Sequence, residues 1–237
     1  MTLRPGITVV IPSIPPRREL LRRAVASVLG QTMPAAALSV VVDSDRAGAA
    51  VTRQRALDAV NTRWVAFLDD DDELKPNHLE ALFSAAVDHD ALYVWSRFQV
   101  ALPRRGIKPW GEPGFELRDG PEPLGAGTFE QWNDEQPAQT TITTLVSTEL
   151  ARAVGGFAPH NRPLVPCEVG GCDDAPDHVH VGDDGNYEID GQRAGEDWDF
   201  TLRCRAAVPL DAMRHVPEVT WLWHHHSNNT SGLPDRW

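Results

Sequence analysis

The first hundred residues alternate between short apolar runs and amphipathic stretches. Short apolar runs, typical of strands covered on both faces, cover residues 7–11, 38–42, 64–68 and 91–95, and the first of them is β-branched throughout. Helical spacing of apolar residues predicts helices over residues 17–29, 50–60 and 76–87. Strands and helices that alternate in this way predict an α/β fold with right-handed crossovers and a mostly parallel sheet.

The second half of the chain is less regular. A Pro- and Gly-rich stretch over residues 103–139 predicts loops, and residues 161–194 predict a second irregular excursion. Between and after these excursions, the pattern predicts strands over residues 140–147 and 218–226 and helices over residues 148–154 and 195–207. Within the second excursion, residues 179–190 resemble a hairpin that turns at Asp184-Gly185. We therefore expect a single domain with irregular insertions.

Polar residues follow the first three predicted strands at the points where these strands end. Pro12 and Ser13 follow the first strand, Asp43 and Asp45 the second, and the run Asp69–Asp72 the third. Ligands of parallel α/β sheets bind at the carboxyl ends of the strands. We therefore expect these residues to face one crevice.

The run of four aspartates places like charges side by side directly after an apolar strand. A solvated turn would tolerate this repulsion, and a bound cation would offset it. Mg²⁺ and Mn²⁺ prefer hard oxygen ligands and often share them with substrate phosphates. The position of the run after a buried strand favours the metal site over the solvated turn.

Composition limits the class of protein. The formal net charge of −12 argues against a general nucleic-acid binder, which needs clustered Lys and Arg. No run reaches the roughly 18 apolar residues of a membrane span, and the N-terminus lacks a signal-peptide pattern. Three cysteines are too few for a disulfide scaffold and fit a reducing compartment. We expect a soluble, cytoplasmic protein without a transmembrane anchor.

Two further groups could take part in chemistry. Glu196 and Asp197 lie in the first turn of a predicted helix, where carboxylates either stabilise the helix dipole or act as a general base. His224 and His226 end the last predicted strand on one face, and His225 lies on the other. A metal held by the aspartates would favour one of these histidines as a further ligand.

A separate cluster combines cysteines and histidines within the second excursion. Cys167, Cys172, His178 and His180 have ligand types that structural zinc binds tetrahedrally, and zinc would pin a loop that has little core of its own. The H-x-H spacing is not the usual finger pattern, so unpaired thiols and surface histidines are the alternative.

Several motifs together resemble family 2 of the inverting glycosyltransferases. The strongest match is AFLDDDDELKPNHLEAL, which is similar to the family signature Phe-Leu-Asp-x-Asp-Asp followed by Pro and Leu. ITVVIPSIPPR resembles the opening strand, AVASVLGQTM the Ser-Val-Leu-x-Gln-Thr helix, and VVVDSD the second strand. VGGF and GEDWDFTLR resemble later elements. The resemblance covers residues 5–98 well and residues 140–231 in pieces.

The resemblance implies a GT-A fold, a Rossmann-like sheet with flanking helices, in one domain over residues 1–237. It implies a nucleotide-binding half over residues 1–98 and an acceptor and catalytic half over residues 99–237, with the insertion at 161–194. It also implies a DXD motif, a Mn²⁺ or Mg²⁺ cofactor, a nucleotide-sugar donor, most simply a UDP-sugar, and a glycan, protein or small-molecule acceptor.

The resemblance also assigns residues to roles. It implies that the nucleotide is held by Pro12, Ser13, Asp43, Arg53, Asp69 and Asp70. Asp69 and Asp71 would form the D-x-D pair, with Asp71 as the direct metal ligand. His226, or His224 in its place, would be the metal-binding histidine late in the sequence. Asp197, next to Glu196, would be the catalytic base. Ser-Ile-Pro-Pro after the first strand, the missing Gly after Asp43 and Gln54 in place of Asn depart from the family pattern.

Two other functions are compatible with the same fold. A nucleotidyltransferase also uses a Rossmann-like sheet and metal-binding carboxylates, but the chain lacks an early Gly-rich phosphate loop with Lys or Arg. A non-catalytic sugar- or cation-binding module would have no reason to keep Asp197 beside an intact D-x-D. The sequence therefore favours a glycosyltransferase.

Overall fold

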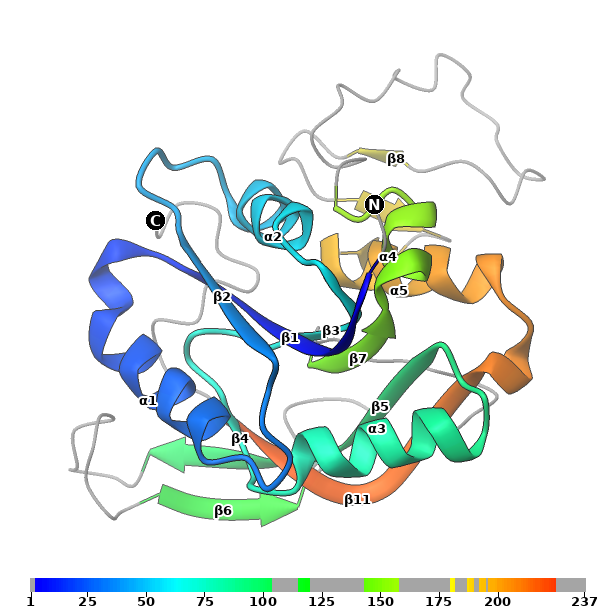
Figure 1. Ribbon diagram of the computed structural model, residues 1–237. Coiled ribbons are helices and arrows are strands. Elements are labelled where there is room, and N and C mark those ends of the chain that lie inside the picture. The colour runs from blue at the N-terminus through cyan, green and yellow to red at the C-terminus, as the bar shows by residue number, and fades with distance from the viewer. Residues whose placement is uncertain are drawn as a thin grey trace.

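The computed structural model describes residues 3–103, 115–119, 143–157, 180–181, 187–189, 192–194 and 196–224. Its centre is a curled sheet with the strand order β2-β1-β3-β7-β5-β11-β4, with β6 paired to β5 (Figure 1). The strands of this sheet are β1 (Arg4–Ser13), β2 (Ala37–Val42), β3 (Thr62–Phe67), β4 (Glu73–Leu74), β5 (Tyr93–Pro103), β6 (Phe115–Asp119), β7 (Thr144–Ser147) and β11 (Met213–His224). The fold is mixed α/β, as the sequence predicts.

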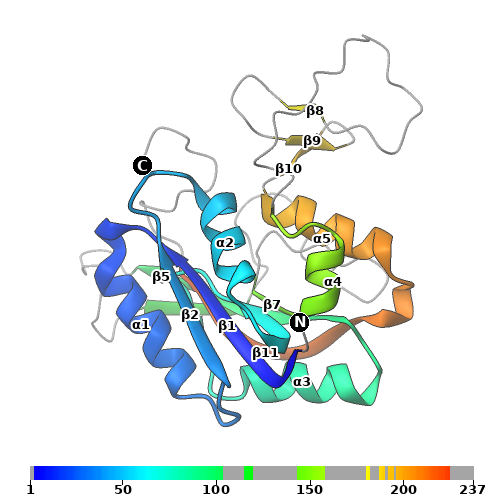
Figure 2. The ribbon, with the colours of Figure 1, turned by 45° about the horizontal axis from the view of Figure 1, so that its top comes forward.

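The helices begin and end close to their predicted bounds. They are α1 (Arg18–Leu29), α2 (Ala49–Asp58), α3 (His78–Asp88), α4 (Thr148–Ala153) and α5 (Glu196–Ala207), with short 3₁₀ helices η1 (Pro15–Arg17) and η4 (Leu210–Ala212). Successive residues of β1 point to opposite faces of the sheet, which divides the core in two. Val9 and Ile11 pack with α1 and α3, whereas Val10 packs with α2, α4 and α5 (Figure 2).

The pairing of the sheet differs from an uninterrupted parallel array. Strands β2, β1 and β3 are parallel neighbours, but β7 pairs antiparallel with both β3 and β5 and separates them. All four residues of β7 are buried, so the strand gains its stability from a place in the middle of the sheet. β11 is parallel to β5, and β4 pairs antiparallel with β11.

Three sequence expectations need correction. The run at residues 38–42 is not fully buried, because β2 is the edge strand and exposes Val40 and Val42. β6 lies within residues 103–139, which were expected to be loops, and it is built by pairing with a longer β5. Inside residues 161–194, a strand that was not expected, β10 (Gln192–Ala194), joins β8 (His180–Val181) and β9 (Tyr187–Ile189) in a second sheet.

The pairing of β8 with β9 confirms the predicted hairpin, although Asp184-Gly185 lies outside the described residues. Within the part of the chain that the structure describes, no helix has the length and apolar character needed to cross a membrane.

A buried polar network joins α3 to the sheet. The His78 ring is fully buried, its Nδ1 lies 2.7 Å from Thr220 Oγ1, and Thr220 Oγ1 lies 2.6 Å from Ser96 Oγ. Burial lowers the pKa of His78 to about 3, because the protonated ring would lose its hydration. The imidazole is therefore neutral in the folded protein at neutral pH.

His78 is expected to make folding stability depend on pH. Its pKa is lower in the folded than in the unfolded state, so its full contribution is present above about pH 6.5 and is lost as the pH falls toward 3. The free energy of unfolding should fall by about 1.4 kcal/mol per pH unit in this window on account of His78. The free energy of unfolding, measured with urea at pH 7, 6 and 5, should fall less steeply with decreasing pH for His78→Leu than for the wild type. The same pH dependence in His78→Leu as in the wild type would contradict this role of His78. His89→Leu, at an exposed position, is the control and should keep the wild-type pH dependence.

Candidate functional site

The ends of β1, β2 and β3 meet at one edge of the sheet. The Asp43 amide donates to the Ser13 carbonyl oxygen at 2.7 Å, and Ser13 Oγ donates to Asp70 Oδ2 at 2.6 Å. Pro12, Ser13, Asp43 and Asp70 are all buried here. The structure therefore brings together Ser13, Asp43 and Asp70, as expected from the parallel order of these strands. Asp45 departs from the expectation, because its side chain is exposed and pairs with Arg55.

Each aspartate of the run makes a different contact. Asp69 Oδ1 lies 2.5 Å from Arg53 Nη2, and Asp72 Oδ1 accepts the His224 amide at 2.9 Å. Asp70 and Asp71 both contact Arg17. Asp70, Asp71 and Asp72 are at most 7% exposed, so the run is not a solvated turn.

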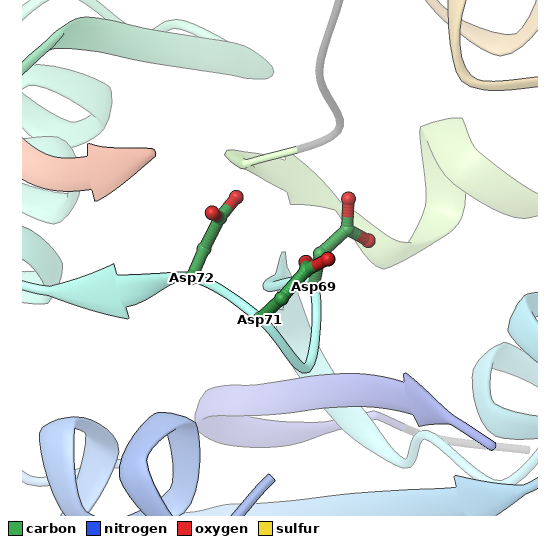
Figure 3. Close-up of side chains that lie close together, drawn as sticks. All are labelled: Asp69, Asp71 and Asp72. Atoms are coloured by element: carbon green, nitrogen blue, oxygen red, sulfur yellow. The ribbon is translucent and has the colours of Figure 1, made fainter. Parts of the chain in front are cut away.

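Three carboxylates of the run lie close enough to share a cation. Asp69, Asp71 and Asp72 each offer an oxygen, and these atoms all lie within 4.8 Å of one another. Figure 3 shows the three side chains projecting to one side of the turn. Oxygen donors at this spacing fit the ligand preference of Mg²⁺ or Mn²⁺. We call Asp69, Asp71 and Asp72 the aspartate cluster.

The electrostatics of the run also fit an added cation. Burial raises the pKa of Asp70 to about 6, the negative charge of Asp71 adds to this rise, and Arg17 and Ser13 oppose it. Burial, together with the charges of Asp71 and Asp69, raises the pKa of Asp72 well above its ordinary value. Both shifts mean that further negative charge is unfavourable here, so a divalent cation would relieve the repulsion.

Two arginines from the N-terminal part of the chain hold the run. Arg17 Nη1 lies 2.9 Å from Asp70 Oδ1 and 2.9 Å from Asp71 Oδ2. Arg23 Nη2 donates to the Asp71 carbonyl oxygen at 2.7 Å, and its Nε lies 2.8 Å from Glu73 Oε1. Neither arginine was predicted as a site residue from the sequence. Their place in η1 and α1, the elements that follow β1, could have indicated them, because these elements lie beside the aspartate run.

Arg53 joins the aspartate cluster to the start of α5. Its side chain is 7% exposed, and its two terminal nitrogens contact Asp69 and Glu196. Although burial alone would lower its pKa, the charges of Asp69, Glu196 and Asp197 raise the pKa of Arg53 overall. The guanidinium is therefore charged and is engaged by carboxylates of the chain itself.

The first turn of α5 carries the predicted catalytic pair. Glu196 and Asp197 are half-buried, and Thr201 Oγ1 donates to the Asp197 carbonyl oxygen at 3.0 Å, which fixes this turn. Glu196 contacts Arg53, and the negative charge of Asp197 contributes to the raised pKa of Arg53, so this turn lies near the arginine. The structure thus brings together carboxylates that are more than a hundred residues apart in the sequence.

Asp43 closes the loop after β2. Its two carboxylate oxygens accept the amides of Ala47 and Gly48, each at 2.8 Å. Gly48 has φ +91°, a conformation that favours glycine and lets the loop return toward Asp43 before α2 begins. The Asp43 side chain therefore shapes the loop at the carboxyl end of β2.

Of the two histidines predicted as metal ligands, the structure describes His224 but not His226. His224 is buried at the end of β11, and its Nε2 lies 2.8 Å from Glu73 Oε1, so Glu73 engages the ring. Burial lowers the pKa of His224. His226, Cys167, Cys172 and His178 lie outside the described residues, as does the side chain of His180, so the second metal ligand and the zinc cluster stay predictions.

Comparisons with known proteins agree with this geometry. Residues 35–132 match the family model described as Glycosyl transferase family 2. The match includes Asp43, Arg53 and the aspartate run, and it does not reach Ser13, Asp197 or His224. A comparison with curated protein sequences finds no match.

Solved structures of S. aureus TarS share the fold. The structure of residues 1–349 in complex with UDP-GlcNAc has a TM-score of 0.56 at 12% identity and covers 94% of this chain. The complex with UDP has a TM-score of 0.54 at 13% identity and covers 93% of this chain. The chain spans 60% of the length of each of these structures. At this identity the likeness shows the fold alone, which is the GT-A fold.

The family match and the fold agree with the order of motifs along the chain and with the meeting of their residues at one sheet edge. Residues 35–132 are thus similar to glycosyl transferase family 2, and the described residues have a GT-A fold.

Proposed function

We propose that the chain is an inverting, metal-dependent glycosyltransferase that moves a sugar from a UDP-sugar to an acceptor hydroxyl. The observation that carries this proposal is the juxtaposition made by Arg53. One guanidinium contacts Asp69 of the aspartate cluster and Glu196, the neighbour of Asp197. A cation site for a diphosphate and a carboxylate able to act as a base thus lie on either side of one buried arginine.

The donor end of the site consists of the three strand ends. Asp71 and Asp69 are proposed to hold Mn²⁺ or Mg²⁺, which would offset the negative charge that develops on the leaving diphosphate. Pro12, Ser13 and the Asp43 loop are proposed to hold the nucleotide, with Asp43 near the base. Two of the matched TarS structures are complexes with UDP-GlcNAc and UDP, and this supports a uridine nucleotide for the proposed donor.

The acceptor end consists of the first turn of α5. Asp197 is proposed to accept the proton of the acceptor hydroxyl as its oxygen attacks the anomeric carbon from the face opposite the diphosphate. This single displacement inverts the anomeric configuration. Arg53 contacts Glu196 and Asp69, so we assign it a positioning role in addition to the nucleotide contact that the resemblance implies.

Nucleotide release from a panel of donors tests the function. The protein is incubated with UDP-, GDP-, dTDP- and CDP-sugars, each with Mn²⁺ and with a chelator, and the released nucleoside diphosphate is measured. We expect release from UDP-sugars with Mn²⁺ and none with the chelator. Release of nucleoside monophosphate together with sugar 1-phosphate would instead show nucleotidyl transfer to water, and no turnover of any donor despite metal and UDP binding would show a non-catalytic module.

A further inference from the structure

We infer that Arg17 is a resident counter-cation of the aspartate cluster, which binds Asp71 in the metal-free protein and competes with the divalent cation for that carboxylate. This inference rests on the proposed function, because it concerns the cation of the same site. It identifies a positioning residue, and it predicts that this residue weakens metal binding.

The first observation is that one carboxylate belongs to two sets of contacts. Asp71 is a member of the aspartate cluster, and its Oδ2 also lies 2.9 Å from Arg17 Nη1. The side chains of Asp71 and Arg17 are 10% and 13% exposed, so solvent screens this pair only weakly. A divalent cation that binds the Asp71 carboxylate at full charge must therefore weaken a largely buried ion pair.

The second observation is that Arg17 has another partner to retain. The same Nη1 lies 2.9 Å from Asp70 Oδ1, and Ser13 Oγ donates to the other oxygen of Asp70 at 2.6 Å. Asp70 is thus held from two sides and does not belong to the aspartate cluster. The Arg17–Asp70 contact can persist while the Asp71 carboxylate moves to the cation.

The third observation is that the backbone at Arg17 is fixed. Arg17 ends η1, in which Pro15 and Pro16 restrict φ, and its amide donates to the Ile14 carbonyl oxygen at 3.0 Å. η1 directly follows Ser13 at the end of β1, so the guanidinium reaches the run from a rigid base. The other two arginines make different contacts with the run, since Arg23 contacts the carbonyl oxygen of Asp71, and Arg53 contacts the carboxylate of Asp69 and also Glu196.

The opposing explanation is that Arg17 preorganises the aspartate cluster and so strengthens metal binding. The two explanations differ in sign. If Arg17 competes, its removal leaves Asp71 available and raises metal affinity. If Arg17 preorganises, its removal loosens the run and lowers metal affinity.

Calorimetric titration of Mn²⁺ into the full chain, without donor, separates the two explanations. We expect Arg17→Met to bind Mn²⁺ roughly tenfold more tightly than the wild type. It should melt at a lower temperature without metal, since the contacts of Arg17 to Asp70 and Asp71 are lost. Arg17→Lys keeps the positive charge and should bind Mn²⁺ within a few-fold of the wild type. Arg22→Met is the control, because it removes the same charge from an exposed position of α1.

Unchanged or weaker Mn²⁺ binding by Arg17→Met would overturn the inference while leaving the proposed function in place. Absence of Mn²⁺ binding in the wild type would overturn both. If Arg17→Met does not fold, the wild type itself gives the answer through ¹⁵N NMR of its arginine side chains. Addition of Mg²⁺ should then speed the rotation of the Arg17 guanidinium, and a rotation that stays slow while Mg²⁺ binds would contradict competition.

Discussion

Replacement of Asp197 by asparagine is expected to lower the turnover of sugar transfer by about 10³-fold, since general bases contribute 10²- to 10⁴-fold. Asparagine keeps the shape of the side chain but cannot accept the proton of the acceptor hydroxyl. Because Thr201 bonds the Asp197 carbonyl oxygen rather than its carboxylate, the first turn of α5 should keep its structure. The measurement is kcat for transfer, together with the dissociation constant of UDP with Mn²⁺.

The dissociation constant of UDP should stay within about threefold of the wild type, because Asp197 is proposed to contact the acceptor and not the nucleotide. Asp211→Asn removes the same charge at an exposed position of η4 and should leave both quantities unchanged. A variant Asp197→Asn that transfers sugar at the wild-type rate would remove Asp197 as the base. Glu196, its neighbour at Arg53, would then be the next residue to test.

The second large effect is expected from Asp71→Asn. Loss of this carboxylate removes a ligand from the aspartate cluster and should abolish activation by Mn²⁺, with a fall in kcat of roughly 10²- to 10³-fold. Stabilisation of transition-state charge by a metal amounts to several kcal/mol, and each 1.36 kcal/mol corresponds to a factor of ten in rate. The measurement is donor turnover as a function of Mn²⁺ concentration.

Asp88→Asn, at the exposed end of α3, is the matched control and should respond to Mn²⁺ like the wild type. Circular dichroism of Asp71→Asn should confirm that the fold persists, since Arg17 retains Asp70 as a partner. Full activation of Asp71→Asn by Mn²⁺ would place the metal elsewhere.

The order of the elements was predictable because the apolar patterns are strong. Buried runs such as residues 64–68 could form little other than covered strands, and helical spacing defined α1 and α3 almost to the residue. The place of β7 between β3 and β5 was not predictable, because pairing partners depend on tertiary packing that a local pattern does not encode. The same reason explains why the valines of β2 were predicted to be buried, although this strand lies at the sheet edge and exposes two of them.

The residue types of the candidate site were predictable, but their partners were not. Strand ends in a parallel sheet gather at one edge, so Ser13, Asp43 and the aspartate run were expected together. Motif spacing could not show that Arg53 contacts Asp69 and Glu196, or that Glu73 engages the ring of His224. These contacts depend on which side chains face one another once α2, α5 and β11 have packed.

The central claim is that the aspartate cluster binds a divalent cation together with a nucleoside diphosphate. Titration of UDP into the wild-type protein, once with Mn²⁺ and once with a chelator, tests this claim most directly. The account predicts that UDP binds at least tenfold more tightly with Mn²⁺, and that Asp71→Asn loses this difference. Equal affinity of the wild type for UDP in the presence and absence of Mn²⁺ would contradict it.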